Sequence, residues 1–156
     1  MQTGLEMAVG ETIAVIDGDG QMPYGDIVRV YKFMKDRRLD FTKTYRVIRH
    51  DGIYRRLISV VYNACFRLLF PGIDSKDINS KPKIMTRAFY EKTDLKSNGW
   101  FIDAEIMILV GRFNATTGEI ETVFNNIESR PSFVKLYSIL EFVANLIWYR
   151  IKEFFV

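Results

Sequence analysis

A run of four apolar residues, Ile13 to Ile16, ends abruptly in two carboxylates, Asp17 and Asp19, which are separated by one glycine. Such a run is typical of a strand that is buried on both faces, as in a parallel sheet. In open α/β sheets, ligands bind just beyond the carboxyl ends of the strands, and Gly18 would let the backbone approach a ligand closely. Carboxylate oxygens this close together suit Mg²⁺ or Mn²⁺, which usually hold phosphates as well. The stretch therefore predicts an α/β fold with a metal–diphosphate site at the end of this strand.

Three other interpretations of this acidic segment compete. A plain surface turn is one, because Asp-Gly pairs are common in turns. An EF-hand loop is excluded, because counting from Asp17 the position that needs glycine holds Met22 and the twelfth residue is Val28. The acidic strand of a nucleotide hydrolase would require a glycine-rich phosphate loop ending in Lys-Ser or Lys-Thr, and this sequence has none. The surface turn and the metal site remain open.

The composition narrows the class of protein. A length of 156 residues with 48% hydrophobic and 14% aromatic content excludes a disordered chain and predicts a single domain over residues 1–156. One cysteine, Cys65, and one histidine, His50, cannot build a zinc site or a Cys/His nucleophile pair with a residue to spare. The sequence shows no signal pattern and no apolar run of membrane-spanning length. We therefore expect a cytoplasmic protein.

Positive charge is concentrated in one segment. Between Arg29 and Arg67 there are eleven Lys or Arg residues and three Asp residues, so the local excess is eight. A solvated helix face explains part of it, and an anionic partner such as a nucleotide, a lipid head group or a nucleic acid explains the rest. An alternative function is thus a non-catalytic basic α/β module that binds anionic lipid or nucleic acid. Nucleic acid is not favoured, because the interleaved aromatics, among them Tyr31 and Phe33, mostly fit the periodicity of a core.

Apolar periodicity and turn residues predict strands that alternate with helices. The expected strands are Ile13–Ile16, Phe41–Val47, Lys83–Thr86 and Glu119–Phe124. The expected helices are Pro23–Lys35, Ile53–Phe70, a short piece ending at Glu91, Phe101–Phe113 and residues 133–156, with a helix end and a turn over residues 1–12. Arg46, Arg49 and His50 are expected in a basic loop after the second strand.

The two long central helices carry the remaining candidate groups. The helix Ile53–Phe70 is expected to turn an apolar face to the core, made of Leu57, Val61, Ala64, Cys65 and Leu68. Arg55 and Ser59, at i and i+4, lie on another face, either as a solvated pair or as phosphate ligands. Asp103 and Glu105 fall near the start of the helix Phe101–Phe113, where the dipole favours anions, so they either cap it or belong to a site.

The last helix, about residues 133–156, is predicted to be amphipathic. Glu141 and Asn145 interrupt its longest apolar stretch, and a charge at bilayer depth is costly. We therefore expect that it does not cross a membrane. Its apolar face is expected to pack on the domain or to rest on a membrane surface as a peripheral contact.

In order and spacing, these motifs resemble the C-terminal portion of a family 2 glycosyltransferase, of the branch similar to dolichyl-phosphate mannosyltransferase. The motifs that carry the resemblance are Thr3-Gly4-Leu5-Glu6 with Gly10, the stretch Ile16–Pro23, Thr44-Tyr45-Arg46 with Arg49-His50-Asp51-Gly52, Arg55-Arg56-Leu57-Ile58-Ser59 with Asn63, Asp77–Lys83, and Asp103-Ala104-Glu105-Ile106. The resemblance implies a partial GT-A (Rossmann-like) nucleotide-diphospho-sugar transferase fold with a mixed sheet flanked by helices. It also implies an enzyme that moves a sugar from a nucleotide-diphosphate sugar to a polyprenyl phosphate or another glycan acceptor.

The resemblance also implies roles for the matching residues. Asp17, Asp19 and Gln21 would hold Mg²⁺ or Mn²⁺ and, through it, the donor diphosphate; Arg46, Arg55, Ser59 and Arg130 would bind phosphates or close the site; Asp77 and Lys83 would line the transfer site. A phosphate acceptor is already a nucleophile and needs no strong base. A hydroxyl acceptor would need one, and Asp77, Asp103 and Glu105 are the candidates.

Two departures from the family pattern bear on function. The acceptor loop has Ser80-Lys81-Pro82 in place of a glycine-containing turn. The N-terminal strands that bind the nucleotide base in the family are not matched, so we expect an N-terminally truncated domain that is not a competent transferase alone. Its acidic strand would then leave an unpaired sheet edge, which invites self-association.

Overall fold

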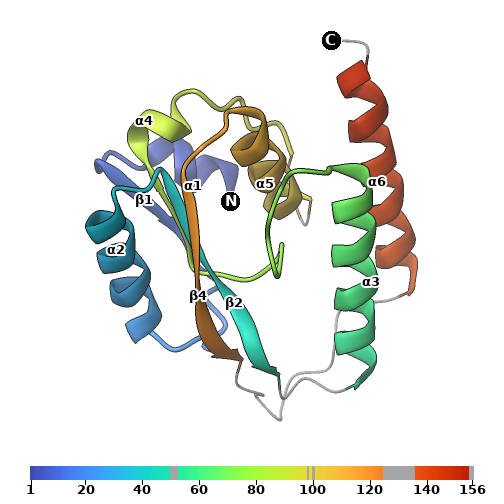
Figure 1. Cartoon of the computed structure of the whole chain (residues 1–156), viewed down its shortest axis with the longest axis horizontal. Coiled ribbons are helices and arrows are strands. Elements are labelled where there is room, and N and C mark those ends of the chain that lie inside the picture. Colours follow the sequence, from blue (N-terminus) through green and yellow to red (C-terminus); the bar gives the residue numbers. More distant parts are fainter. Residues whose placement is uncertain (50–52, 98, 100, 125–135, 155–156) are drawn as a thin grey trace.

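The computed structural model describes residues 1–49, 53–97, 99, 101–124 and 136–154, and this part of the chain folds around a mixed four-stranded sheet (Figure 1). The strands are β1 (Thr12–Val15), β2 (Phe41–Arg49), β3 (Lys83–Thr86) and β4 (Thr117–Phe124), in the order β1-β3-β2-β4. Strand β3 is antiparallel to both β1 and β2, whereas β2 and β4 run parallel. The α/β class and the mixed sheet flanked by helices are confirmed, and this arrangement is compatible with a Rossmann-like fold.

The helices follow the predicted order with small shifts at their ends. They are α1 (Gln2–Met7), α2 (Gly25–Arg37), α3 (Ile53–Leu69), α4 (Arg87–Tyr90), α5 (Ile102–Arg112) and α6 (Leu136–Phe154). Strand β2 is longer than predicted and runs through Arg46 and Arg49, so these two residues lie in a strand and not in the expected basic loop. His50 lies outside the described residues.

The predicted environment of the first strand is wrong. Strand β1 was expected to be buried on both faces in a parallel sheet, but it is an antiparallel strand at the edge of the described sheet. Ile13 and Val15 are buried, whereas Ala14 is exposed and Ile16 is 51% exposed. Apolar residues at consecutive positions do not reveal which face a strand buries when every position is apolar.

The two faces of the sheet pack against different helices. Helix α2 covers one face, where Val30 and Met34 contact Ile84 of β3. The larger core lies on the other face and joins Phe41 and Met85 to apolar residues of α3, α5 and α6. Since successive side chains of a strand point to opposite faces, Lys83 points to the same side as Met85, toward α5. Lys83 faces Val15 of β1 and Lys43 of β2 in the register.

The predicted core face of α3 is also wrong. The residues that reach the core are Tyr62 and Phe66 of the helix and Phe70 just after its end. Leu57, Val61 and Leu68, which were expected there, are exposed by 60%, 46% and 82%. The helix has two apolar stripes, and the larger aromatic side chains of the second stripe remove more apolar area from water.

Helix α6 runs beside α3 and buries one side of itself. Leu146 is fully buried, and the Phe142 ring contacts the Tyr62 ring edge-on, with 5.4 Å between centroids. Ile147 and Ile151 on the same helix are each 45% exposed. No helix in the described part of the chain is both long enough and apolar enough to cross a membrane.

Candidate functional site

The acidic loop, defined here as Asp17 to Gln21, follows β1 directly and stands at the surface. The Asp17 side chain is 41% exposed. The Asp19 carboxylate accepts a hydrogen bond of 3.1 Å from the backbone N–H of Gln21, which folds the loop back on itself. Both the surface turn and the metal-site interpretation fit this geometry.

The chemistry of the loop suits a hard divalent cation. Mg²⁺ keeps several waters or phosphate oxygens and needs only one or two protein carboxylates, which Asp17 and Asp19 can supply. Among the described residues no group of three or more His, Cys, Asp or Glu residues is arranged to hold a metal alone. Asp17 and Asp19 alone would leave the other positions around such a cation to water or to phosphate oxygens.

Behind this loop lies a buried ionic cluster made of Lys81, Lys83 and Asp103. The Lys81 ammonium is 2.7 Å from Asp17 Oδ1 and 3.1 Å from Asp103 Oδ2, so it bridges the two carboxylates. Lys83 Nζ donates to Asp103 Oδ1 and is fully buried. Strand β3 and its approach supply the lysines, and the first turn of α5 supplies Asp103. The cluster joins the acidic loop to the interior of the domain.

The backbone on either side of Lys81 is held in place by β2. Thr44 Oγ1 donates to the Lys81 carbonyl at 2.6 Å and lies 2.8 Å from Ser80 Oγ, and the Thr44 backbone N–H donates to the Pro82 carbonyl at 3.2 Å. All of these atoms belong to buried residues. The position of the Lys81 side chain is thus set by main-chain contacts and not only by its ion pairs.

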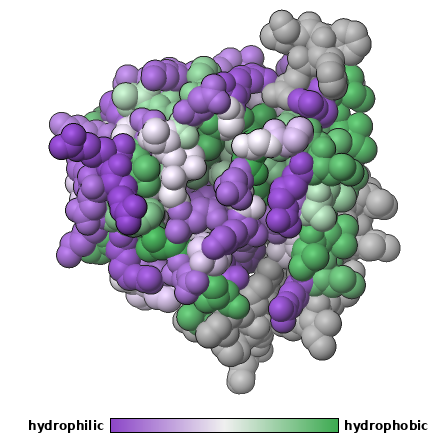
Figure 2. Space-filling view, viewed as in Figure 1, coloured by the Kyte–Doolittle hydropathy of each residue, from purple (hydrophilic) through white to green (hydrophobic). Residues whose placement is uncertain are grey.

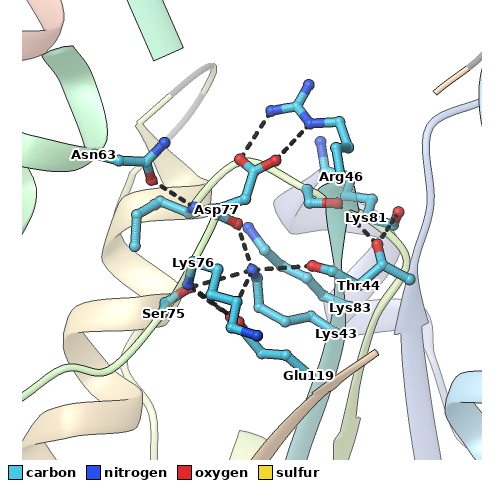
Figure 3. A network of polar contacts seen from close by, with 12 residues as sticks. Lys43, Thr44, Arg46, Asn63, Ser75, Lys76, Asp77, Lys81, Lys83 and Glu119 are labelled. Carbon is cyan, nitrogen blue, oxygen red and sulfur yellow. Dashed lines mark hydrogen bonds and ion pairs between the residues drawn. The ribbon is translucent and has the colours of Figure 1, made fainter. Parts of the chain in front are cut away.

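Asp77 forms a bidentate salt bridge with Arg46 on β2 (Figure 3). The Arg46 Nε and NH2 groups donate to Asp77 Oδ2 and Oδ1 at 2.5 and 2.8 Å, and the two side chains are only 11% and 8% exposed. The next residue is also tied down, since the Ile78 N–H donates to Asn63 Oδ1 at 2.9 Å. Bidentate pairs of this kind are geometrically specific, so Asp77 and Arg46 fix the orientation of each other's side chain.

A second buried network, which the sequence did not predict, surrounds Lys43. Its ammonium donates to Ser75 Oγ at 3.2 Å and to the Asp77 carbonyl, and it pairs with Glu119 Oε1 at 3.0 Å. Ser75 Oγ in turn donates to Glu119 at 2.6 Å. The sequence gives one indication of this network: Lys43 lies between two threonines in the middle of a strand, where a charged residue is unusual. The network fastens the 72–82 segment to the sheet.

Burial and pairing set the charge states in the cluster. Burial lowers the pKa of Lys83 to about 8, although Asp103 opposes the change. Burial also lowers the pKa of Lys43. For Asp103, burial favours the neutral acid, but Lys83 and Lys81 outweigh it and the pKa of the carboxyl is lowered. For Lys81, burial is outweighed by Asp103 and Asp17, and its pKa is raised. At neutral pH Lys81 and Asp103 are therefore charged, and Lys83, whose pKa is about 8, is mostly protonated.

The structure brings some predicted site residues together and separates others. Asp17, Lys83 and Asp103 meet through Lys81, whereas Arg46 and Asp77 form the neighbouring pair. Asp77, Lys83 and Asp103 are all buried, so their side chains have little contact with solvent. Ser59 accepts hydrogen bonds from the amide of Asn63, at 2.7 Å on its carbonyl. The Arg55 side chain and the whole of Arg130 lie outside the described residues.

Glu105 is separate from this cluster. Its fully buried carboxylate accepts backbone N–H bonds from Lys96 and Ser97, the latter at 2.8 Å, and so holds the segment that leads to α5. It lines a cavity of about 450 Å³ between α5 and α6, away from the acidic loop. Helix α5 starts after Phe101 without a side-chain capping bond, so Asp103 and Glu105 are not its caps.

No family model matches this chain, and no curated protein matches its sequence. Its function is therefore inferred from the geometry of the site and from the resemblance noted in the sequence.

Proposed function

We propose that this chain is a metal-dependent glycosyltransferase domain of the GT-A type, which moves a sugar from a nucleotide-diphosphate sugar to a polyprenyl phosphate. One observation carries the proposal. Lys81 joins Asp17 of the acidic loop to Asp103, at 2.7 and 3.1 Å, so the loop assigned to the donor lies against the segment assigned to the acceptor. That juxtaposition is what a transfer between two bound phosphates requires.

Each residue has a role in this proposal that follows from its exposure. Asp17 and Asp19 would hold Mg²⁺ or Mn²⁺ with the donor diphosphate, with Gln21 beside them. When bound, the ion would neutralise charge on the leaving nucleotide diphosphate. Lys83 and Asp103 are positioning residues, because both are buried and act through Lys81. The Arg46–Asp77 pair fixes the neighbouring segment in the same way.

The state of the three candidate bases supports a phosphate acceptor over a hydroxyl acceptor. Asp77 is held by Arg46, Asp103 by two lysines, and Glu105 by backbone N–H groups. For Asp103, burial is outweighed by the two lysines and the pKa of the carboxyl is lowered, so this carboxylate is a weak base. A phosphate acceptor is already ionised and needs no proton removed, so an acceptor of this kind suits a site whose carboxylates are all engaged.

The test is a transfer assay on the purified chain. A panel of nucleotide-diphosphate sugars is incubated with a short-chain polyprenyl phosphate, with Mn²⁺ or with a chelator, and the lipid product is detected by mass spectrometry. We expect a glycosylated lipid with one donor, and none with the chelator. Because the base-binding strands of the family pattern are not matched in this sequence, we expect turnover to be slow, and the product that forms should require the metal. Product that forms equally well with the chelator would contradict the proposal.

A specific observation also favours lipid binding, with or without catalysis. Helix α3 presents a stripe of exposed apolar residues at helical spacing, namely Leu57, Val60, Val61 and Leu68. Figure 2 shows hydrophobic surface along the side of the molecule formed by α3 and α6. The exposed Arg56 and Arg67 stand on the same helix. An apolar stripe with basic neighbours suits the surface of an anionic membrane, where a polyprenyl phosphate would reside.

This stripe can be tested by co-sedimentation with phosphatidylglycerol–phosphatidylcholine vesicles. We expect binding that weakens with salt and that falls about tenfold or more in Leu57→Glu or Leu68→Glu, because each change removes one buried leucine from the bound state. Val28→Glu on α2, where Val28 is 54% exposed, is the matched control and should bind like the wild type. Equal binding by all variants would rule out the stripe. Binding without any transfer would favour the non-catalytic lipid-binding module.

A further inference from the structure

The Lys81 ammonium contacts the carboxylate of Asp17, one of the two residues proposed to bind the metal. The ammonium is 2.7 Å from Asp17 Oδ1, and the Lys81 side chain is only 8% exposed. Asp19, in contrast, accepts a hydrogen bond from the backbone N–H of Gln21. The two carboxylates of the loop therefore differ, because one is engaged by a buried cation and the other by a neutral donor.

We propose that the Lys81 ammonium is a built-in cation of the acidic loop, which competes with divalent metal for Asp17 and so weakens metal binding in the absence of donor. The inference rests on the proposed function, since it concerns the same loop. A metal ion at Asp17 Oδ1 and an ammonium at the same oxygen repel each other, so each must displace the other from that atom.

The structure gives Lys81 a second partner that makes such an exchange feasible. When Asp17 is taken over by a metal, Lys81 keeps Asp103 at 3.1 Å, so the buried ammonium still contacts a carboxylate, which it shares with Lys83. Its main chain stays fixed, because Thr44 holds the Lys81 and Pro82 carbonyls. Only the end of the side chain has to move. Asp19 would then be the first ligand that an incoming metal meets.

The charge of the donor fits this arrangement. A nucleotide diphosphate brings negative charge that both the metal and the displaced ammonium can share. Metal and donor would therefore bind more tightly together than either binds alone. In a variant with a neutral residue in place of Lys81, the affinity for metal would depend less on the donor, because no ammonium would compete for Asp17.

The experiment measures Mn²⁺ binding to the full chain without donor, by electron paramagnetic resonance of the free ion. We expect Lys81→Gln and Lys81→Met to bind Mn²⁺ about tenfold more tightly than the wild type. Lys81→Arg keeps the charge and should stay close to the wild type. Asp17→Asn should bind more weakly, and Asp17→Asn combined with Lys81→Gln should show no gain from the second change. Urea unfolding of each variant confirms that it is folded.

The possible failures are distinguishable. Affinity for Mn²⁺ that depends on Asp17 but is the same in the wild type, Lys81→Gln and Lys81→Met would overturn the role of Lys81 and leave the proposed function standing. Absence of Mn²⁺ binding in every variant, even with a nucleoside diphosphate added, would overturn the metal site and with it both proposals.

A second measurement needs no mutation: it follows the rate at which an amine-reactive reagent labels Lys81 in the wild-type chain. Mn²⁺ should raise that rate, and an unchanged rate would also contradict the exchange.

Discussion

Replacing Asp103 by Asn is expected to lower the free energy of unfolding by about 3–5 kcal/mol, the usual effect of removing one partner of a buried ion pair. Asp103 is the anion that Lys83 and Lys81 share inside the domain, and Lys83 has no exposed surface. The neutral amide of Asn cannot balance the two ammonium groups. In the mutant, Lys83 must therefore stay charged without a counter-charge or lose its proton. Urea unfolding followed by circular dichroism at neutral pH measures the change.

The pH dependence of this deficit identifies its cause. The pKa of Lys83 is about 8 in the folded wild type, well below the ordinary lysine value of 10.5 that applies to the unfolded chain, and without Asp103 the folded pKa must fall further. A group with a depressed lysine pKa destabilises the fold below that pKa, because the unfolded chain binds the proton more tightly. The deficit of Asp103→Asn should therefore be largest at neutral pH or below and should shrink as the pH rises toward about 8. A deficit that is independent of pH would point to lost packing instead.

Asp94→Asn is the matched control for the ion-pair argument. Asp94 also pairs with a lysine, Lys96 at 2.9 Å, but both side chains are largely exposed, by 82% and 65%. Exposed pairs contribute little, so the unfolding curve should not move measurably. If both variants lose the same stability, burial of the Asp103 cluster is not the reason for its effect.

Local sequence patterns were sufficient to place the elements. Turn residues and periodicity located each described strand and helix, and Lys83–Thr86 was predicted with the bounds that β3 has. They were not sufficient to place those elements in three dimensions. The apolar run before Asp17 fits a central and an edge strand equally well, and only the pairing of β1 with β3 decides between them.

The face of α3 shows a second limit. Periodicity predicts that apolar stripes exist on a helix, but not which of two stripes the core uses. Leu57 and Leu68 fit the period as well as Phe66 does, yet Phe66 is buried and both leucines are exposed. The choice depends on what α5 and α6 present to the helix, which is information far away in the chain.

In the candidate site, local sequence likewise identified individual residues but not their distant partners. Asp17 and Asp19 were recognisable because they follow a strand directly. The partner of Asp17 was not, because Lys81 is 64 positions away in the chain. The same holds for Lys43 and Glu119, which are 76 positions apart. The unexpected Ser80-Lys81-Pro82 sequence marks a departure from the family pattern, but nothing local to it indicates that its lysine reaches the acidic loop.

The second large effect is expected at the acidic loop itself. Asp17→Asn or Asp19→Asn should reduce metal-dependent binding of a nucleotide-diphosphate sugar by about a hundredfold or more, because a neutral amide is a poor ligand for a hard cation. Stability should change by less than about 1 kcal/mol in Asp19→Asn, because the Asp19 carboxylate accepts a hydrogen bond only within the surface loop. Asp17→Asn should cost more, because it removes one of the two carboxylates that the buried Lys81 ammonium contacts. Asp17 itself is 41% exposed, however, and Lys81 retains Asp103 when Asp17 is lost. Loss of binding without loss of stability in Asp19→Asn would separate the role of this loop from that of Asp103.

The central claim is that the acidic loop binds the donor through a divalent cation, and isothermal titration calorimetry of the wild-type chain tests it most directly. The chain is titrated with nucleotide-diphosphate sugars in the presence of Mn²⁺, again with a chelator, and then as Asp19→Asn. We predict saturable binding with Mn²⁺ that disappears both with the chelator and in the variant. Donor affinity that is the same with and without metal, or that survives in Asp19→Asn, would contradict the account.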